Sequence, residues 1–312
     1  MLLILTCSMD RTTDLVMDQL GSLPIFRFNI DLWRDYRWSI SQDGYFLEDP
    51  TRRSCRSEEV RAVYLRKLVF NPPHFDLPAS GNEEAWCREE VMQIWQGIHD
   101  LALQEQCLAL VHPSHLGRWS KIRQMVVAKH YFRVPPWEMF HGNSNATFER
   151  AVVKTQGSQS PGIEGMVMVR EVDVAKLSSD FPWFVQSLIM LATHDVTVAY
   201  VKGQCFSFES SRDQFAGPDC RIPTATGEAK WRRCELTPAE EKAVQDFMQM
   251  TGHSFGRLDF LRDSDGLWFL ELNPNGQFAW LDLDGSEGLL KAVADEILMV
   301  YHKSSRVGIP EQ

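Results

Sequence analysis

The sequence predicts a mixed α/β protein of about three lobes, and three stretches of the chain carry this prediction. The chain opens with an apolar strand at residues 2–6, a helix at 10–20 and a second strand at 23–28, in β-α-β order. Strand pairs around short polar turns follow at 36–47 and 196–208. A chain of 312 residues that mixes helices with strand hairpins has room for two or so packed domains.

The other elements follow from periodicity and turn signals. Residues 237–251 form a helix, because Thr237 and Pro238 start it and Glu240 is placed for a capping box. We also expect strands at 60–65, 107–111, 151–154 and 166–170, an apolar segment at 184–189, and helices at 83–104, 120–131 and 288–301.

Composition excludes several classes of function. The formal net charge is -10 and the pI is about 5.4, which argues against a general polyanion binder and predicts no nucleic-acid partner. The 7 cysteines are an odd number without a CxxC pair, so we expect reduced thiols in a cytoplasmic protein. The apolar N-terminus is too short for a signal peptide, and no apolar run approaches the length of a membrane span.

The most informative stretch is GRLDFLRDSDGLWFLELNPNGQ at residues 256–277. Two apolar segments flank a polar turn that ends in Gly266, which predicts a β-hairpin. If the hairpin folds symmetrically about Asp265, Asp259 lies across from Glu271. The same register places Arg257 across from Asn273.

Asp259, Glu271 and Asn273 would then share one face of this hairpin, because side chains alternate along a strand. Two carboxylates and an amide oxygen suit a hard cation such as Mg²⁺ that holds a phosphate. A solvated strand face with incidental acids is the alternative, and the residues alone leave both open. The opposite face would pack on a core with Leu258, Phe260, Trp268, Leu270 and Leu272.

Four basic positions upstream are candidates for anion binding. Lys154 ends a strand beside the Gly- and Ser-containing loop 155–162, where it could meet phosphates. Arg66-Lys67 ends a buried strand, and such ends often face a cleft in α/β domains. Lys121 on a helix and Arg232-Arg233 on a loop could bind anions, although solvated surface charges are the commoner interpretation of both.

The order of these pieces resembles the ATP-grasp superfamily. The resemblance rests on Lys121, Lys154, the segment 184–186, Asp195 to Gly203, and the acids of the C-terminal hairpin. Within the superfamily, the chain is similar to the maturases of ribosomal peptides that make microviridins and related graspetides. Two segments carry this: NPNGQFAW at residues 273–280, similar to their NPxGQ-aromatic-x-Trp signature, and VYLRK at 63–67, similar to their aromatic-then-basic strand end.

The resemblance implies an ATP-grasp fold and an ATP-dependent ligase. Residues 1–115 would form an N-terminal α/β domain, 116–205 a central lobe and 206–312 a C-terminal lobe, with ATP between the two lobes. A substrate carboxylate would attack the γ-phosphate, and a hydroxyl or amine would capture the acyl phosphate to give an ester or amide. The implied roles are Lys121 and Lys154 on the phosphates, Gln186, Ser187 and Leu188 as the adenine hinge, Asp195 near the nucleotide, Asp259, Glu271 and Asn273 on Mg²⁺, and Arg232 as a catalytic clamp on the acyl phosphate together with Lys154.

Two departures from the family pattern bear on the substrate. Relatives usually carry an arginine at the place of Thr197, so Lys202, Arg232 or Arg233 would have to compensate. His112-Pro113 stands where an asparagine-proline pair is expected. Neither departure touches the metal set.

The resemblance also implies a partner, a precursor peptide with a leader and a core of acidic and hydroxyl or lysine side chains. Arg66-Lys67 could receive that anionic core, and relatives of this type are commonly homodimers. Two other interpretations stay open. One is a ligase that adds a free amino acid to a protein or small-molecule carboxylate, and the other is a binding protein that keeps a nucleotide fold without turnover.

Overall fold

The computed structural model describes residues 1–66, 82–110, 119–142, 144, 147–154, 169–224 and 229–304. The chain divides into two compact units. The first holds Met1–Leu116, His253–Gly256 and Pro274–Gln312, and the second holds Gly117–Gly252 and Arg257–Asn273. The finer division at 115/116 and 205/206 stays a prediction.

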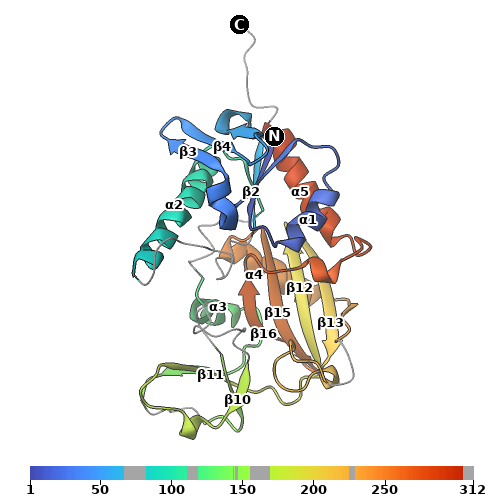
Figure 1. Cartoon of the computed structure of the whole chain (residues 1–312). Coiled ribbons are helices and arrows are strands. Elements are labelled where there is room, and N and C mark those ends of the chain that lie inside the picture. Colours follow the sequence, from blue (N-terminus) through green and yellow to red (C-terminus); the bar gives the residue numbers. More distant parts are fainter. Residues whose placement is uncertain are drawn as a thin grey trace. The chain divides into compact units, whose positions relative to one another are not determined.

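A four-stranded parallel sheet in the order β2-β1-β6-β7 forms the centre of the first unit. Its strands are β1 (Leu2–Thr6), β2 (Ile25–Asn29), β6 (Ala62–Leu65) and β7 (Leu108–Ala109). Every residue of β1 and β6 is buried, as expected for a parallel sheet covered on both faces. The covering helices are α1 (Arg11–Asp18), α2 (Asn82–Gln104) and α5 (Leu289–Ser304) (Figure 1).

A small antiparallel sheet completes the first unit. Its strands are β3 (Arg37–Ser41), β4 (Gly44–Glu48) and β5 (Ser54–Arg56). The short helices η1 (Ile30–Asp35), η2 (Ser57–Glu59) and η6 (Ala279–Leu281) belong to the same unit, and η6 lies against α1 and α5. The predicted hairpin at 36–47 is confirmed, but β5 is not foreseen because three residues carry too little pattern.

The second unit is built on a five-stranded sheet in the order β14-β13-β12-β15-β16. The strands are β12 (His194–Val201), β13 (Gln204–Ser211), β14 (Arg232–Arg233), β15 (Phe255–Asp263) and β16 (Gly266–Asn273). Figure 1 labels β12, β13, β15 and β16 of this sheet. Helix α4 (Pro238–Thr251) packs its Val244 and Phe247 against Val196 and Phe260 of one sheet face. The predicted capping box of Thr237 and Glu240 at the start of α4 is confirmed.

A second sheet of this unit has the order β10-β9-β11-β8. Its strands are β8 (Trp137–Phe140), β9 (Ala151–Val153), β10 (Arg170–Val172) and β11 (Trp183–Ser187). Helix α3 (Lys121–Ala128) and the short helices η4 (Val174–Lys176) and η5 (Arg212–Gln214) complete the unit.

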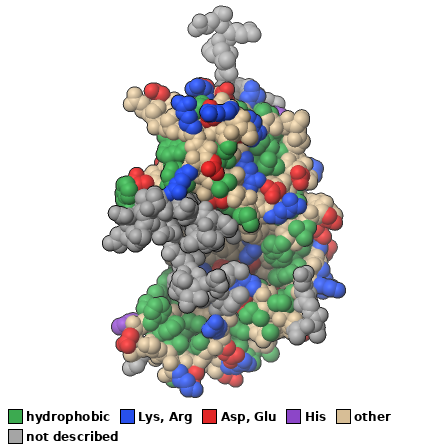
Figure 2. All heavy atoms as spheres, in the orientation of Figure 1, with side chains coloured by type: hydrophobic (Ala, Val, Ile, Leu, Met, Phe, Trp, Pro, Cys, Tyr) green, Lys and Arg blue, Asp and Glu red, His purple; other side chains and the backbone are tan. Residues whose placement is uncertain are grey.

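On the face drawn in Figure 2, basic and acidic side chains are interspersed. No helix among the described residues is long and apolar enough to cross a membrane. The six cysteines whose side chains are described are free thiols.

Candidate active site

The C-terminal hairpin has the register that the sequence predicts around its acids. Asp259 pairs with Glu271, and Arg257 pairs with Asn273, along the antiparallel strands β15 and β16. Because directly paired residues point to the same face, all four side chains share one face of the sheet. Leu258 lies on the other face and is fully buried.

Nearer the turn, the predicted set of core residues is partly wrong. The register shifts between Asp259 and Phe260, so Phe260 pairs with Phe269 and one extra residue, Leu270, is inserted in β16. This bulge sends Leu267 and Phe269 into the core in place of Trp268 and Leu270.

Trp268 has a different role from the one expected. Its ring lies 3.9 Å under the guanidinium of Arg133, and its Nε1 donates to Asp263 Oδ2 at 2.7 Å. Arg133 also binds Asp263 Oδ1 at 2.7 Å. Trp268 is therefore part of a cation–π and hydrogen-bond cluster at the hairpin end rather than of the core.

One amide group lies between the two facing carboxylates. Asn273 Nδ2 donates to Glu271 Oε1 at 2.9 Å and to Asp259 Oδ2 at 3.2 Å. A single point therefore lies within contact distance of both acids, and a cation there would be held by two carboxylates. If the amide turned about its last side-chain bond, Oδ1 would become the third oxygen. This all-oxygen donor set fits Mg²⁺.

Cationic side chains balance the charge of the acid pair. Arg257 Nη2 lies 2.9 Å from Asp259 Oδ2, and Lys121 Nζ lies 3.3 Å from Glu271 Oε2. Thr197 Oγ1 on β12 donates to Asp259 Oδ1 at 2.8 Å. Burial alone would raise the pKa of Glu271, but Lys121 and Lys154 hold that pKa below its ordinary value.

Helix α3 is fixed so that Lys121 reaches Glu271. Ser120 caps the helix by accepting from Arg123 N at 3.2 Å. One turn from Lys121, the buried Gln124 pairs with the backbone of Leu272: its Nε2 donates to the carbonyl at 3.0 Å, and its Oε1 accepts from the N–H at 2.8 Å. The side-chain amide of Gln124 thus bonds both backbone groups of Leu272, as the backbone of a neighbouring strand would.

Lys154 lies directly after β9 and faces the same charges. Its N–H donates to Phe184 O at 3.1 Å, which ties it to β11. Burial lowers the pKa of Lys154, while the negative charge of Glu271 raises it. Lys154 therefore belongs electrostatically to the acid pair. The loop expected to cover phosphates at 155–162 lies outside the described residues.

The predicted hinge residues lie at the end of β11. Gln186 is buried with its Nε2 3.5 Å from Met125 Sδ. Ser187 N donates to Pro136 O at 2.8 Å, and Leu188 N donates to Arg150 O at 2.9 Å. Both N–H groups therefore bind within the fold, so an adenine contact at these residues would use their carbonyl oxygens or displace these bonds.

Asp195 lies two residues before Thr197 on the same face of β12. It pairs with Arg212 at 2.7 Å, and Arg212 also donates to Gly217 O at 3.1 Å. Burial raises the pKa of Asp195 to about 6, against the opposing effect of Arg212. Arg212 was not among the candidates from sequence, because it reaches Asp195 only through the pairing of β12 with β13.

Arg232 does not lie where the sequence suggested. Arg232 and Arg233 form the short strand β14 rather than a loop, and Arg232 pairs with Glu209, which pairs with Val196 on the α4 side of the sheet. Its Nη2 binds Glu209 Oε1 at 2.7 Å, and its side chain is 74% exposed. This placement on the face away from Asp259 argues against the expected clamp role.

Comparisons with known proteins bear on this arrangement. Neither a scan of protein-family models nor a search of curated protein sequences gives a match. A RiPP-associated ATP-grasp ligase from Chryseobacterium gregarium, solved with ADP and a leader and core peptide, superposes with a TM-score of 0.77 at 20% identity over 96% of both chains. The chain has the ATP-grasp fold.

Two further solved structures of this fold are similar over nearly the whole chain. The macrocyclase MdnC from Microcystis aeruginosa, bound with precursor peptide MdnA, has a TM-score of 0.75 at 20% identity and covers 96% of this chain and 99% of its own. The ATP-grasp ligase PsnB with minimal precursor, Mg and ADP has a TM-score of 0.70 at 16% identity, over 96% and 97%. The ATP-grasp fold predicted from the sequence is thereby confirmed.

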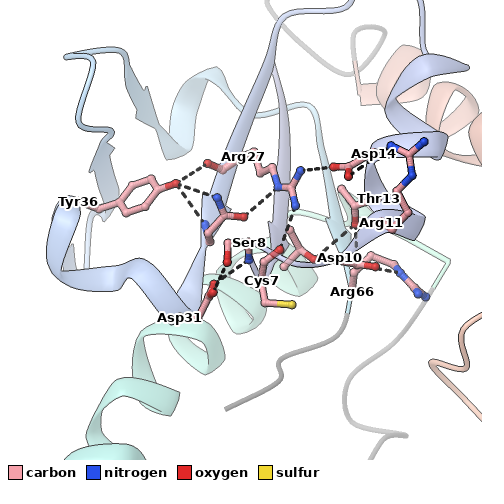
Figure 3. A network of polar contacts seen from close by, with 12 residues as sticks. Cys7, Ser8, Asp10, Arg11, Thr13, Asp14, Arg27, Asp31, Tyr36 and Arg66 are labelled. Atoms are coloured by element: carbon pink, nitrogen blue, oxygen red, sulfur yellow. Dashed lines mark hydrogen bonds and ion pairs between the residues drawn. The ribbon is translucent and has the colours of Figure 1, made fainter. Parts of the chain in front are cut away.

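Arg66, at the end of β6 in the first unit, is not accessible to an anionic ligand. Its side chain is 0% exposed and lies 3.5 Å from Asp10 Oδ2 (Figure 3). Its Nη1 donates to Asn275 Oδ1 at 2.7 Å, and its guanidinium lies 5.2 Å from the centre of the Phe278 ring. Arg66 therefore holds the segment after Asn273 in place. Lys67 and His112-Pro113 lie outside the described residues.

Proposed function

We propose that this protein is an ATP-dependent carboxylate ligase that condenses side chains within a ribosomal peptide. The observation that carries the proposal is the shared face of Asp259, Glu271 and Asn273, with Lys121, Lys154 and Arg257 beside it, in an ATP-grasp fold. The similar structures support the choice of substrate, since their names describe a RiPP-associated ligase and a macrocyclase with leader, core or precursor peptides.

The proposed reaction has two steps. A carboxylate oxygen of the peptide bonds to the γ-phosphorus of ATP, the bond from that phosphorus to the β,γ-bridging oxygen breaks, and ADP leaves with the electron pair. A hydroxyl or amine of the same peptide then bonds to the acyl carbon, and the carbon–oxygen bond to phosphate breaks. The nucleophile's proton passes to the departing phosphate or to solvent, so the products are an ester or amide, ADP and phosphate.

The residues of the site have electrostatic and positioning roles in this proposal. Lys121 and Lys154 would bind the phosphates, because charge on the transferred group must be neutralised as an anionic carboxylate approaches it. Mg²⁺, held by Asp259, Glu271 and Asn273, would supply charge neutralisation on phosphate oxygens when bound. Gln186, Ser187 and Leu188 would flank the adenine, and Asp195 would lie near the nucleotide.

The proposed partner is a precursor peptide whose leader binds away from the reacting groups. Leader binding raises the effective concentration of a core that itself binds weakly. The net charge of -10 repels an acidic core at long range, so attraction must be local. Arg66 is buried in the first unit and cannot receive the acidic core. We therefore expect an accessible cation of the second unit to attract it. We also propose that the protein is cytoplasmic, in keeping with the free thiols of its described cysteines. A homodimer is proposed from the family resemblance alone.

Mass spectrometry tests this proposal. The purified protein is incubated with ATP, Mg²⁺ and a short peptide encoded beside it, with a core of Thr or Ser and Asp or Glu. We expect the peptide to lose the mass of one water for each bond formed. A gain of a free amino acid's mass would instead identify a ligase for free amino acids, and no ATP turnover with any substrate would identify a binding protein.

The control is Glu271→Gln, which keeps the shape of the side chain and removes one ligand charge. Loss of several kcal/mol of charge stabilisation predicts a rate reduction of about a hundredfold or more, since about 1.4 kcal/mol corresponds to tenfold. Unchanged ligation by a folded Glu271→Gln protein would exclude this hairpin as the metal site.

A further inference from the structure

The sheet face that carries the acid pair also carries a row of side chains that crosses all five strands. Arg233 on β14 pairs with Phe208 on β13, and Phe208 pairs with Thr197 on β12. Thr197 Oγ1 donates to Asp259 Oδ1 on β15 at 2.8 Å, and Asp259 pairs with Glu271 on β16. Because directly paired residues point to the same face, Arg233 lies on the face of the acid pair.

The sequence leaves three basic residues to compensate for Thr197, and the structure distinguishes them. Arg232 binds Glu209 at 2.7 Å on the α4 side of the sheet, away from the acid pair. Lys202 lies in the turn between β12 and β13, five positions beyond Thr197, which is about 17 Å along an extended strand. Of the three, Arg233 is the residue that lies in the row of Thr197.

Arg233 is held on this face by aromatic rings. Its guanidinium lies 5.0 Å from the ring centre of Phe206 and 5.1 Å from that of Phe208. Both rings are buried, whereas Arg233 is exposed. A ring supplies no counter-charge, and stacking on the guanidinium plane leaves the N–H groups at its edge directed sideways. The side chain is therefore positioned to bind an anion from solvent.

We propose that Arg233 binds a carboxylate side chain of the peptide substrate, next to the one that is activated at the Asp259–Glu271 face. The proposal rests on the ligase function proposed above and names the residue that would select an acidic core. A guanidinium binds the two oxygens of a carboxylate in bidentate geometry. Arg233 would thus be the accessible cation of the second unit that attracts the acidic peptide.

Strand spacing gives the distance between the two bound carboxylates. Adjacent strands lie about 4.8 Å apart, and the guanidinium of Arg233 lies over β13, two strands from Asp259 on β15. The separation is therefore roughly 10 Å. An extended peptide advances about 3.3 Å per residue, so the second acid should lie two or three residues from the one that is activated.

The test is a binding cycle between Arg233 and each acid of the peptide. The proteins are wild type, Arg233→Ala, Arg233→Lys and, as a matched control, Arg232→Ala, which removes the neighbouring arginine from the other face. The ligands are the fluorescently labelled precursor peptide encoded beside the protein, and versions in which one Asp or Glu of the core becomes Asn or Gln. Fluorescence anisotropy is measured with ADP and Mg²⁺ but without ATP, so that no ligation occurs.

We expect Arg233→Ala to bind the unchanged peptide about tenfold more weakly, the effect of one lost charge-assisted contact. One neutralised peptide should lose the same factor with wild type and nothing further with Arg233→Ala, because its partner is already gone. Arg233→Lys should recover the affinity in part, since it keeps the charge without the planar fork. Arg232→Ala should bind every peptide as wild type does.

In the ligation assay, Arg233→Ala should raise the KM for the peptide by about tenfold and leave kcat and the KM for ATP near wild type. A structural role predicts another pattern, a lower melting temperature and the same loss with every peptide. That pattern, or wild-type peptide affinity in Arg233→Ala, would overturn the proposal. Absence of ligation by the wild type would contradict the proposed function, whereas the binding cycle would still decide whether Arg233 contacts an acid.

Discussion

Asn273 and Asp195 are residues whose surroundings, rather than their identities, set what they can do. Asn273 lies between two carboxylates with its amide nitrogen toward both, so it satisfies them without a metal and can present oxygen to one. Asp195 is buried beside Arg212, and burial has the larger effect on its pKa. The proton on Asp195 therefore depends on pH, and the orientation of the Asn273 amide would depend on a bound cation.

The pKa of Asp195 predicts a dependence of stability on pH. Burial raises the pKa to about 6 from the ordinary value of 3.8, so the folded protein holds a proton that the unfolded chain has released between these values. Asp195 therefore stabilises the folded protein fully below its unfolded-state pKa of 3.8, and this stabilisation is lost as the pH rises through about 6. The change is at most about 3 kcal/mol.

Urea unfolding at several pH values measures this contribution against Asp195→Asn. The variant keeps the size of the side chain and does not titrate, so its free energy of unfolding should lack the fall that wild type shows from about pH 4 to about pH 7. Parallel curves for the two proteins would show that Asp195 titrates near its ordinary value.

Helix α3 and strand β16 form one positioning element through Gln124. The two hydrogen bonds to Leu272 lie between Glu271 and Asn273 along the strand, and Lys121 is on the same helix. Movement of α3 would thus change the Lys121–Glu271 distance and the backbone that carries both predicted metal ligands.

We expect Gln124→Ala to destabilise the protein by about 2 kcal/mol and to weaken binding of ADP with Mg²⁺. The reason is that two buried backbone groups of Leu272 would lose their partners. Thermal unfolding and calorimetry measure the two effects, with Gln249→Ala on the exposed side of α4 as control. A stable Gln124→Ala protein with wild-type nucleotide affinity would show that this pairing is dispensable.

Among the helices and strands, the sequence predicts the long elements well and the short ones poorly. Helix α4 is recognisable from its capping box, and β15 and β16 from their apolar residues around a turn. The bulge at Leu270 is invisible in the pattern, because one inserted residue leaves both strands apolar while exchanging Trp268 for Phe269 in the core. Strand β14 has two residues and exists only through its pairing with β13.

The site itself could be predicted only where its residues are close in sequence. Asp259, Glu271 and Asn273 belong to one hairpin, so their common face follows from strand alternation. Gln124 and Arg212 act on partners brought near by the tertiary fold, and no local pattern marks them. Arg232 and Arg66 were expected to bind anions because of their charge, but Glu209 and Asp10 already pair with them.

Across the whole molecule, a fully buried ion pair contributes to the stability of the first unit. Arg66 lies beside Asp10, and Asp10 accepts from Thr6 at 2.8 Å and Thr13 at 2.7 Å. Burial would raise the pKa of Asp10, but Arg66 and these hydroxyls lower it overall. Acid should therefore remove this contribution as the pH falls below the ordinary pKa of the carboxyl.

Removing one partner of the Arg66–Asp10 pair should lower the free energy of unfolding by more than removing both. We expect Arg66→Met to destabilise the protein by about 3–5 kcal/mol, since Asp10 would remain as an uncompensated buried charge. The double variant Arg66→Met with Asp10→Leu should recover part of that loss. Thermal unfolding of wild type, both single variants and the double variant measures the coupling, and additive effects would mean that the two groups are independent.

In the proposed reaction, a peptide carboxylate is activated as an acyl phosphate at the Asp259–Glu271 face. The most direct measurement labels the side-chain carboxylates of the precursor peptide with a heavy isotope of oxygen. After ligation, the label is located among the products of ATP. Because the carboxylate oxygen stays on phosphorus when the acyl bond breaks, we predict one labelled oxygen in the released phosphate for each bond formed. Bond formation with unlabelled phosphate, or with the label in AMP, would contradict the account.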